Sequence, residues 1–162
     1  MAKMQPFWYF LPPPCPSGEQ ILDGGFESVN PFVYWTRSSI NVKQTSYTKH
    51  SGIYSCEVPK DEWILQTLTE AILVKCVESF TLWHQLGFTP YPLLLVVTIT
   101  YTDNSATVIN VYGTDGYWHE LNIKPYLTVG KAIKQILCSY PVSNPSGTCV
   151  SLDDVSLIGS GE

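Results

Sequence analysis

Apolar and polar residues alternate with a period of two along most of this chain, which is typical of strands that bury one face. The clearest run is VVTITYT, in which Val97, Ile99 and Tyr101 share one face and three threonines share the other. The turn residues DNS then precede a second alternating run, ATVINVY. Residues 96–112 are therefore predicted to form an antiparallel hairpin.

Similar short runs recur about every ten residues between turn signals, as in antiparallel sandwiches and barrels. No run has the period of a long amphipathic helix, and we assign TVGKAIKQIL, which also admits a helical turn, to a strand. Further strands are predicted at GGFES, FVYWT, INVKQTS, IYSCEV, WILQTLT, VKCVESFTLW, WHELNI, KQILCSY and TCVSLDDVSLI. The predicted fold class is all-β, a two-sheet antiparallel β-sandwich over residues 19–162, preceded by a Pro-rich arm over residues 1–18.

The composition indicates a folded domain and argues against nucleic acid and membrane as partners. Hydrophobic residues make up 44% of the 162, enough for a sizeable core. The net charge is -5 and Lys and Arg are scattered, so no nucleic-acid partner is expected. The sequence has no apolar segment long enough to span a bilayer, so no membrane insertion is expected either.

The five cysteines are odd in number and lack the spacing of a zinc site. Cys138 and Cys149 end two strand-like runs joined by a short loop, so we predict a disulfide between them, with Cys56 and Cys76 as a second pair. Cys15 would then be free or paired with another chain. The alternative is five buried thiols in a reducing compartment.

The alternation along TCVSLDDVSLI slips by one position at Asp153 and Asp154. Such a slip indicates a β-bulge, which re-aims a side chain and interrupts the ladder. We expect Asp154 to turn inward, where a carboxylate needs a cation or several donors, and Asp153 to lie in solvent.

The segment ILDGGFES offers partners for that carboxylate, because Asp23 and Glu27 flank two glycines. Glycines permit unusual backbone angles and expose carbonyl oxygens, and calcium binds carboxylate and carbonyl oxygens. We predict a structural calcium ion held by Glu27 and Asp154, with Asp23 and the main chain near Ser51 as further ligands.

Taken in order, the motifs DGGFES, VYWTRS, KHSGIYSCEV, WILQTLT, FTLWHQ, VTITYTDNSATV, WHELNI and SLDDVSL resemble the jelly-roll carbohydrate-binding modules of the galactose-binding-like superfamily. The resemblance spans residues 20–158. It implies a jelly roll, a core position for Trp35, and a structural calcium on Glu27 and Asp154 with main-chain oxygens from the HSG turn. The arm and the loop HQLGFTPYP are additions to the family pattern.

Sugar-binding jelly rolls stack a pyranose on exposed aromatic rings and satisfy its hydroxyls with nearby polar groups. The candidate ligand-binding residues are Trp63, Trp83, Tyr91, Tyr112, Asp115, Tyr117 and Trp118. The segment YGTDGYWHE concentrates four of them in a loop at a strand end, where binding function often lies. For Trp83, a core position is an equal alternative to ligand contact. For Trp118, the alternative is a structural role that anchors the strand WHELNI.

No enzymatic constellation is found, because the three histidines lack supporting motifs and adjacent carboxylates do not face each other across a substrate. We predict a non-catalytic module that binds a glycan or polysaccharide, located outside the cell or on a cell or virion surface. The alternative is a self-assembling structural subunit, of a virion coat, fibre or extracellular filament. Its arm, with the aromatic residues Phe7, Trp8, Tyr9 and Phe10, would pack into a neighbouring copy.

Overall fold

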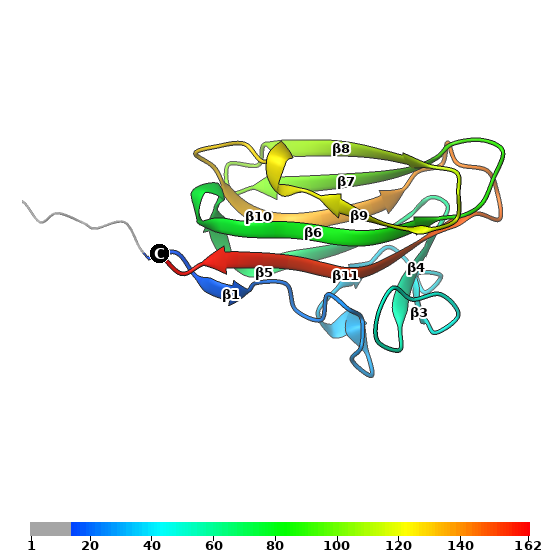
Figure 1. The fold of residues 1–162 in the computed structure, drawn as a ribbon, viewed down its shortest axis with the longest axis horizontal. Helices are drawn as coiled ribbons and strands as arrows, with labels where there is room; N and C mark the ends of the chain where they lie inside the picture. Colours follow the sequence, from blue (N-terminus) through cyan, green and yellow to red (C-terminus); the bar gives the residue numbers. More distant parts are fainter. Residues whose placement is uncertain (1–13) are drawn as a thin grey trace, which may run out of the picture.

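The computed structural model describes residues 14–162, and within that range it contains strands and short 3-10 helices but no α-helix (Figure 1). The strands are β1 (Ser17–Glu19), β2 (Thr36–Arg37), β3 (Lys43–Thr45), β4 (Ser55–Pro59), β5 (Glu62–Leu73), β6 (Val77–Leu86), β7 (Leu93–Tyr101), β8 (Ala106–Gly113), β9 (Trp118–Asn122), β10 (Ala132–Tyr140) and β11 (Cys149–Ser160). The 3-10 helices are η1 (Pro31–Val33), η2 (Val74–Cys76) and η3 (Lys124–Tyr126).

The strands form two antiparallel sheets. Sheet A has the order β3-β4-β11-β6-β9, and β1 also pairs with the end of β11. Sheet B has the order β2-β5-β10-β7-β8. This confirms the predicted two-sheet β-sandwich.

The core lies between the inner faces of the two sheets. On β7, the five residues Leu93, Leu95, Val97, Ile99 and Tyr101 are buried, and the four between them face outward and are partly buried. The predicted hairpin is therefore confirmed as β7 and β8, and the ambiguous segment is strand β10. Trp35 is almost fully buried with its ring 5.3 Å from that of Phe26, which confirms its core position.

Two of the predicted strands are loops instead. GGFES forms no strand, and FVYWT contributes only the first residue of β2, after helix η1. Asp23 and Phe26 adopt left-handed backbone angles with φ of 50° and 56°, and these turns break an extended run.

The predicted disulfides are wrong, and the disulfide formed is Cys15–Cys76, with 5.3 Å between the Cα atoms. Cys138 points into the core from sheet B, whereas Cys149 lies on the far side of sheet A, so they cannot meet. Cys56 lies opposite Leu152 on β11, but β6 begins opposite Gly159, about 24 Å along the same strand. Cys56, Cys138 and Cys149 are therefore free thiols.

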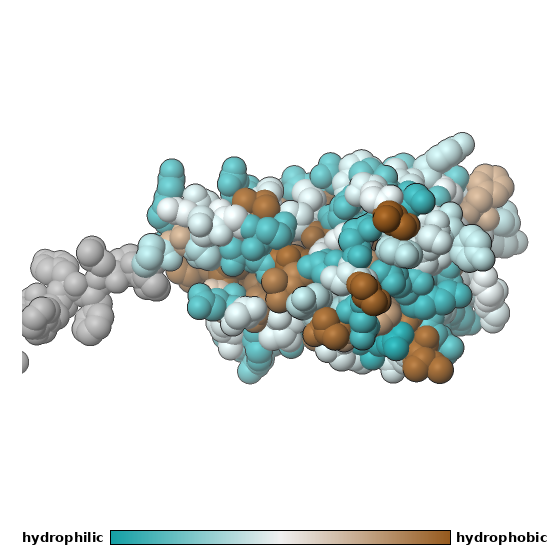
Figure 2. All heavy atoms as spheres, turned by 90° about the horizontal axis from the view of Figure 1, so that it is seen from below, coloured by the Kyte–Doolittle hydropathy of each residue, from teal (hydrophilic) through white to brown (hydrophobic). Residues whose placement is uncertain are grey.

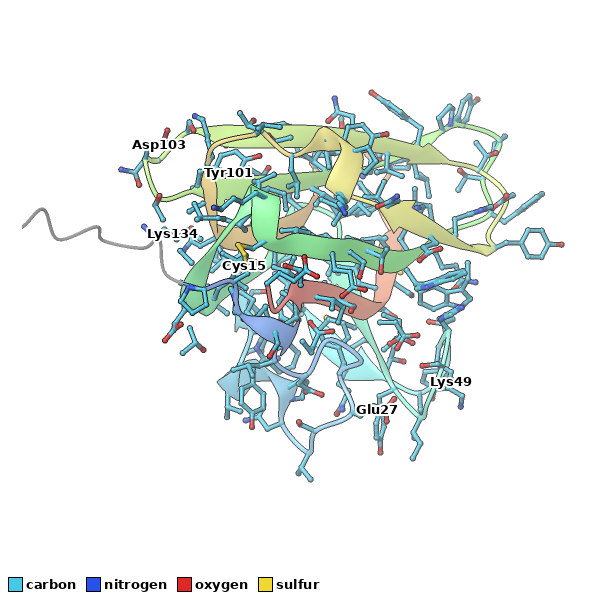
Figure 3. All side chains as sticks on the ribbon, turned by 60° about the vertical axis from the view of Figure 1, so that its left-hand side comes forward. Cys15, Glu27, Lys49, Tyr101, Asp103 and Lys134 are labelled. Carbon is cyan, nitrogen blue, oxygen red and sulfur yellow. A yellow bond between two sulfur atoms is a disulfide. The ribbon has the colours of Figure 1, made fainter. Side chains whose placement is uncertain are left out.

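Both ends of the described chain lie at one end of the sandwich (Figure 1). There β1 pairs with β11, the backbone N–H of Cys15 donates to Glu162 (3.1 Å), and the disulfide of Cys15 is drawn in yellow in Figure 3. Residues 17–18, assigned to the arm, already belong to β1, whereas the aromatic run at residues 7–10 lies outside the described residues.

The surface of the domain is mixed in polarity. The face seen in Figure 2 carries apolar side chains as separate patches among polar ones. Among the described residues, no helix has the length and apolar character needed to span a membrane.

Candidate functional site

The outer face of sheet B carries a row of four residues that lie directly opposite one another. These are Trp63 on β5, Ser139 on β10, Val96 on β7 and Asn110 on β8. The next row along the strands, Ile64, Cys138, Val97 and Ile109, is buried in the core. Because side chains alternate between faces, the row that begins at Trp63 faces outward.

Two further outward rows extend this surface, which we call the sheet B platform. They are Leu65, Leu137, Thr98 and Val108, and then Thr67, Gln135, Thr100 and Ala106. On the other side of the first row, Tyr112 on β8 lies opposite Leu94 and is 64% exposed. Strands in a sheet are about 4.8 Å apart, so β5 and β8 are separated by about 14 Å.

The platform combines aromatic rings with uncharged hydrogen-bonding groups. Trp63 lies on β5, next to the short edge strand β2, and Tyr112 lies on the opposite edge strand β8, with Ser139 and Asn110 in the row that begins at Trp63. The three rows contain no charged side chain. Such a surface can stack the apolar faces of a ligand on its two edges and bind hydroxyl groups between them.

Trp83 and Trp118 lie on the opposite side of the molecule, on the outer face of sheet A. The His50 ring stacks on Trp83 with centroids 3.6 Å apart, and its centroid lies 6.0 Å from that of Trp118. One face of the Trp83 indole is therefore covered by His50.

Tyr91, Asp115 and Tyr117 lie in the two loops beside this face, with both tyrosines largely exposed. The Asp115 carboxylate accepts the N–H of Tyr117 (3.0 Å) and contacts the His119 ring (2.8 Å). These hydrogen bonds, first that of Tyr117, lower the pKa of Asp115. Asp115 thus holds its own loop together.

The acidic pair of β11 forms the predicted bulge, because the register of β11 against β6 shifts between Asp153 and Ser156. Asp154 has a left-handed φ of 45°, and Val155 donates its N–H to the carbonyl of Gly24 (3.0 Å). A Cβ on Gly24 would lie 1.8 Å from the Val155 carbonyl oxygen, so only glycine allows this contact.

The expectation that Asp153 lies in solvent is wrong, because its side chain is fully buried. Its carboxylate accepts the backbone N–H groups of His50 (2.9 Å), Ser51 (3.2 Å) and Asp154 (2.8 Å). Burial raises the pKa of Asp153, and these three donors oppose that shift. Asp153 therefore anchors the loop at residues 46–54 to β11.

Asp154 and Glu27 both approach Gly25. A Cβ on Gly25 would lie 3.5 Å from Asp154 Oδ1 and 3.6 Å from Glu27 Cγ. Glu27 Oε1 accepts the N–H groups of Ile53 (2.8 Å) and Tyr54 (2.9 Å), which joins its loop to the loop of Lys49 (Figure 3).

The other two predicted metal ligands hydrogen-bond within this cluster. Ser51 Oγ donates to Asp154 Oδ1 (2.9 Å), and Asp23 Oδ1 accepts the N–H of Glu27 (2.9 Å). Over residues 14–162 no three His, Cys, Asp or Glu side chains are grouped to hold a metal ion. Carboxylate oxygens are ligands that calcium prefers. Because too few of them are grouped here, a calcium ion would also need main-chain oxygens as ligands.

Comparisons with known proteins place this geometry among solved folds. No protein-family model and no curated protein matches the sequence. A family 16 carbohydrate-binding module matches with a TM-score of 0.59 at 12% identity, over 86% of this chain and 99% of that one. The xylan-binding domain CBM22-1 of Xyn10C from Paenibacillus barcinonensis matches with a TM-score of 0.57 at 14% identity, over 90% and 97%. The module TmCBM61, solved with β-1,4-galactotriose, matches with a TM-score of 0.59 at 18% identity, over 88% and 99%.

The fold is that of the jelly-roll carbohydrate-binding modules. At these identities the likeness establishes the fold and leaves the ligand to be argued from the surface. On this jelly roll, the sequence-predicted residues Trp63 and Tyr112 share the sheet B platform, and the other five lie on or beside sheet A.

Sequence reasoning missed the polar residues of the platform, Ser139 and Asn110. Their signal was present in the strand alternation, since Ser139 falls between two buried residues on β10 and Asn110 falls between buried Ile109 and partly buried Val111 on β8. Finding them required the order of strands in the sheet, which places β5 next to β10 and β7 next to β8.

Proposed function

We propose that this chain is a non-catalytic carbohydrate-binding module that holds a neutral glycan across the sheet B platform. The observation that carries the proposal is the row from Trp63 through Ser139 to Asn110, with Tyr112 at the opposite edge. The absence of charge from the platform rows favours an uncharged oligosaccharide. The glycan-bound and xylan-binding modules of the same fold support this class of ligand.

The experiment replaces Trp63 and Tyr112 by Ala, singly and together. Each single change removes one stacking surface, so binding at the platform should weaken roughly tenfold, and the double change should abolish binding at the platform. Isothermal titration calorimetry with xylohexaose, β-1,4-galactotriose and a mixed-linkage β-1,3-1,4 tetrasaccharide measures the effect. Tyr126→Ala is the matched control, because Tyr126 is exposed to a similar degree as Tyr112 (53% against 64%) but lies in η3, which packs against β6 of sheet A. Undiminished binding by the double variant would refute the platform as the site.

A structural calcium ion at Glu27 and Asp154 is part of the proposal. Asp154 Oδ1 and Glu27 Cγ both lie near Gly25, the Glu27 carboxylate lies against Gly52, and the loop at residues 46–54 supplies nearby main-chain atoms. A calcium ion there would join the first loop of the domain to the bulge of β11. Binding of the ion would then stabilise the folded state, and the ion would not contact the glycan.

Removal of the ion is tested by thermal melting with and without a chelator. Chelation should lower the melting temperature by about 5 °C or more if the ion contributes a few kcal/mol. Asp154→Asn, which keeps the shape of the side chain, should melt at the lower temperature in both conditions. An identical midpoint for the unaltered chain with and without chelator would remove calcium from the proposal.

We place the module in an oxidising compartment, outside the cell or on its surface. The support for this is the Cys15–Cys76 disulfide, because such bonds persist mainly in secreted proteins.

A further inference from the structure

The outer face of sheet A carries a second row of aligned side chains. Lys43, Glu57, Ser151, Gln85 and Trp118 lie directly opposite one another on β3, β4, β11, β6 and β9. On the central strands their neighbours, such as Val58, Val150 and Leu152, are buried in the core, so this row faces away from the sheet B platform. Four polar side chains, of which Lys43 and Glu57 form an ion pair, thus lead to the partly buried indole of Trp118.

The middle of this row is the floor of a hollow of about 290 Å³. Its lining includes Thr48, Glu57, Gln85, Phe88, Cys149 and Ser151. Phe88 is 85% exposed at its rim, and Trp118 adjoins Gln85 on the neighbouring strand. A volume at the small end of the range for ligand sites suits one or two sugar residues.

The walls of the hollow are tied to the sheet. On one side, the backbone of the loop at residues 46–54 is held by Asp153, and its His50 ring stacks on Trp83. On the other side, Gln85 Nε2 donates to the carbonyl of Gly116 (2.6 Å), which fixes the loop before β9. A site assembled in advance loses little entropy when a ligand binds.

The chemistry of the lining selects for a neutral, hydroxylated ligand. Among the described residues, no Lys, Arg or His lines the hollow, and the nearby Lys43 is paired with the lining residue Glu57 (3.5 Å), so the lining offers an anion no free cation. Glu57 and the hydroxyls of Thr48 and Ser151 can accept or donate hydrogen bonds to sugar hydroxyls. Phe88 and Trp118 offer rings against which a pyranose face can stack.

We propose that this hollow is a second carbohydrate site, which binds one terminal or branching neutral sugar residue. It is independent of the platform, because the two sites lie on opposite faces of the sandwich. A single molecule would therefore hold two glycan chains at once and bridge them.

The test measures how many equivalents of ligand the chain binds, and it uses one double variant for each face of the sandwich. The probes are the three oligosaccharides named above and the methyl β-pyranosides of xylose, galactose and glucose, at millimolar concentration. The unaltered chain should bind two equivalents, Trp118→Ala with Gln85→Ala should lose one, and Trp63→Ala with Tyr112→Ala should lose the other. In nuclear magnetic resonance spectra, the indole N–H signal of Trp118 should shift with a methyl glycoside while that of Trp63 reports the platform.

Cys149 provides a second readout that does not alter the rings. It lines the hollow as a partly exposed thiol, whereas Cys56 and Cys138 are buried. Alkylation with N-ethylmaleimide should fill the hollow and remove one equivalent of binding, while platform binding persists. Cys149→Ser treated in the same way should keep both equivalents.

The outcomes separate the two proposals. Loss of all binding in the Trp63 and Tyr112 variant, with none left for a methyl glycoside, overturns the second site and leaves the platform standing. Binding that survives in that variant but disappears with the Trp118 and Gln85 changes overturns the platform instead. A chain that binds no probe overturns both.

Discussion

His84 is a buried histidine without a hydrogen-bond partner. Its Nδ1 atom is the one buried side-chain nitrogen or oxygen in residues 14–162 that makes no hydrogen bond. The residue faces inward on β6, opposite His119 on β9, with the ring centroids 6.0 Å apart. Burial, and then the proximity of His119, lower the pKa of His84 to about 4, and the Asp115 carboxylate opposes this shift.

This pKa makes stability depend on pH in a definite direction. The unfolded chain protonates His84 near pH 6.5, whereas the folded chain keeps it neutral down to about pH 4. The free energy of unfolding therefore has its full value above pH 6.5, and it falls by up to about 3 kcal/mol as the pH drops toward 4. Urea unfolding of the unaltered chain and of His84→Leu, at pH 7 and pH 4.5, measures the difference. Equal acid sensitivity of both proteins would contradict the prediction.

Single residues were predictable where one local pattern determined their place. The phase slip in TCVSLDDVSLI located the bulge, and Trp35 occupies the core as the family resemblance implied. The sequence could not reveal that Asp153 is buried, because its three donors include the backbone N–H groups of His50 and Ser51, about a hundred residues away.

At the scale of elements, alternation predicted strands well and failed where turns interrupt them. Every second side chain of β7 is buried, β10 alternates in the same way after its register shift between Ile133 and Gln135, and β8 buries Ile109 between outward-facing residues. The run GGFES has the composition of a strand, yet the left-handed angles of Asp23 and Phe26 make it a compact turn that supports Gly24 against β11. The alternation of apolar and polar residues does not show whether such a run forms an extended strand or a compact turn.

Pairing between elements was the part that the sequence did not determine. The cysteine pairs were chosen by separation along the chain, but a disulfide depends on which sheet and which face each strand presents. The candidate sugar-binding residues divide for the same reason. Trp63 and Tyr112 share one face because β5, β10, β7 and β8 are neighbours, and Trp83 and Trp118 share the other through β6 and β9.

At the scale of the molecule, the disulfide closes a loop of the chain that contains β1 to β5. Cys15 and Cys76 are separated by 61 residues, so the bond limits the freedom of much of the unfolded chain. Replacing both by Ser should reduce the free energy of unfolding by about 2–4 kcal/mol. Chemical denaturation measures this loss, and Cys149→Ser, which removes a free thiol, is the matched control. A double variant as stable as the control would show that the bond contributes nothing to folding.

The joining of both ends of the described chain, Cys15 and Glu162, to one side of sheet A also sets how tension would pass through the molecule. A pull on Cys15 is transferred by the disulfide to the residue before β6, and a pull on Glu162 enters β11, the strand paired with β6. The load path therefore closes within sheet A. The strands that carry Trp63 and Tyr112 lie outside it, so a tethered molecule under tension would keep the platform in its unstrained shape.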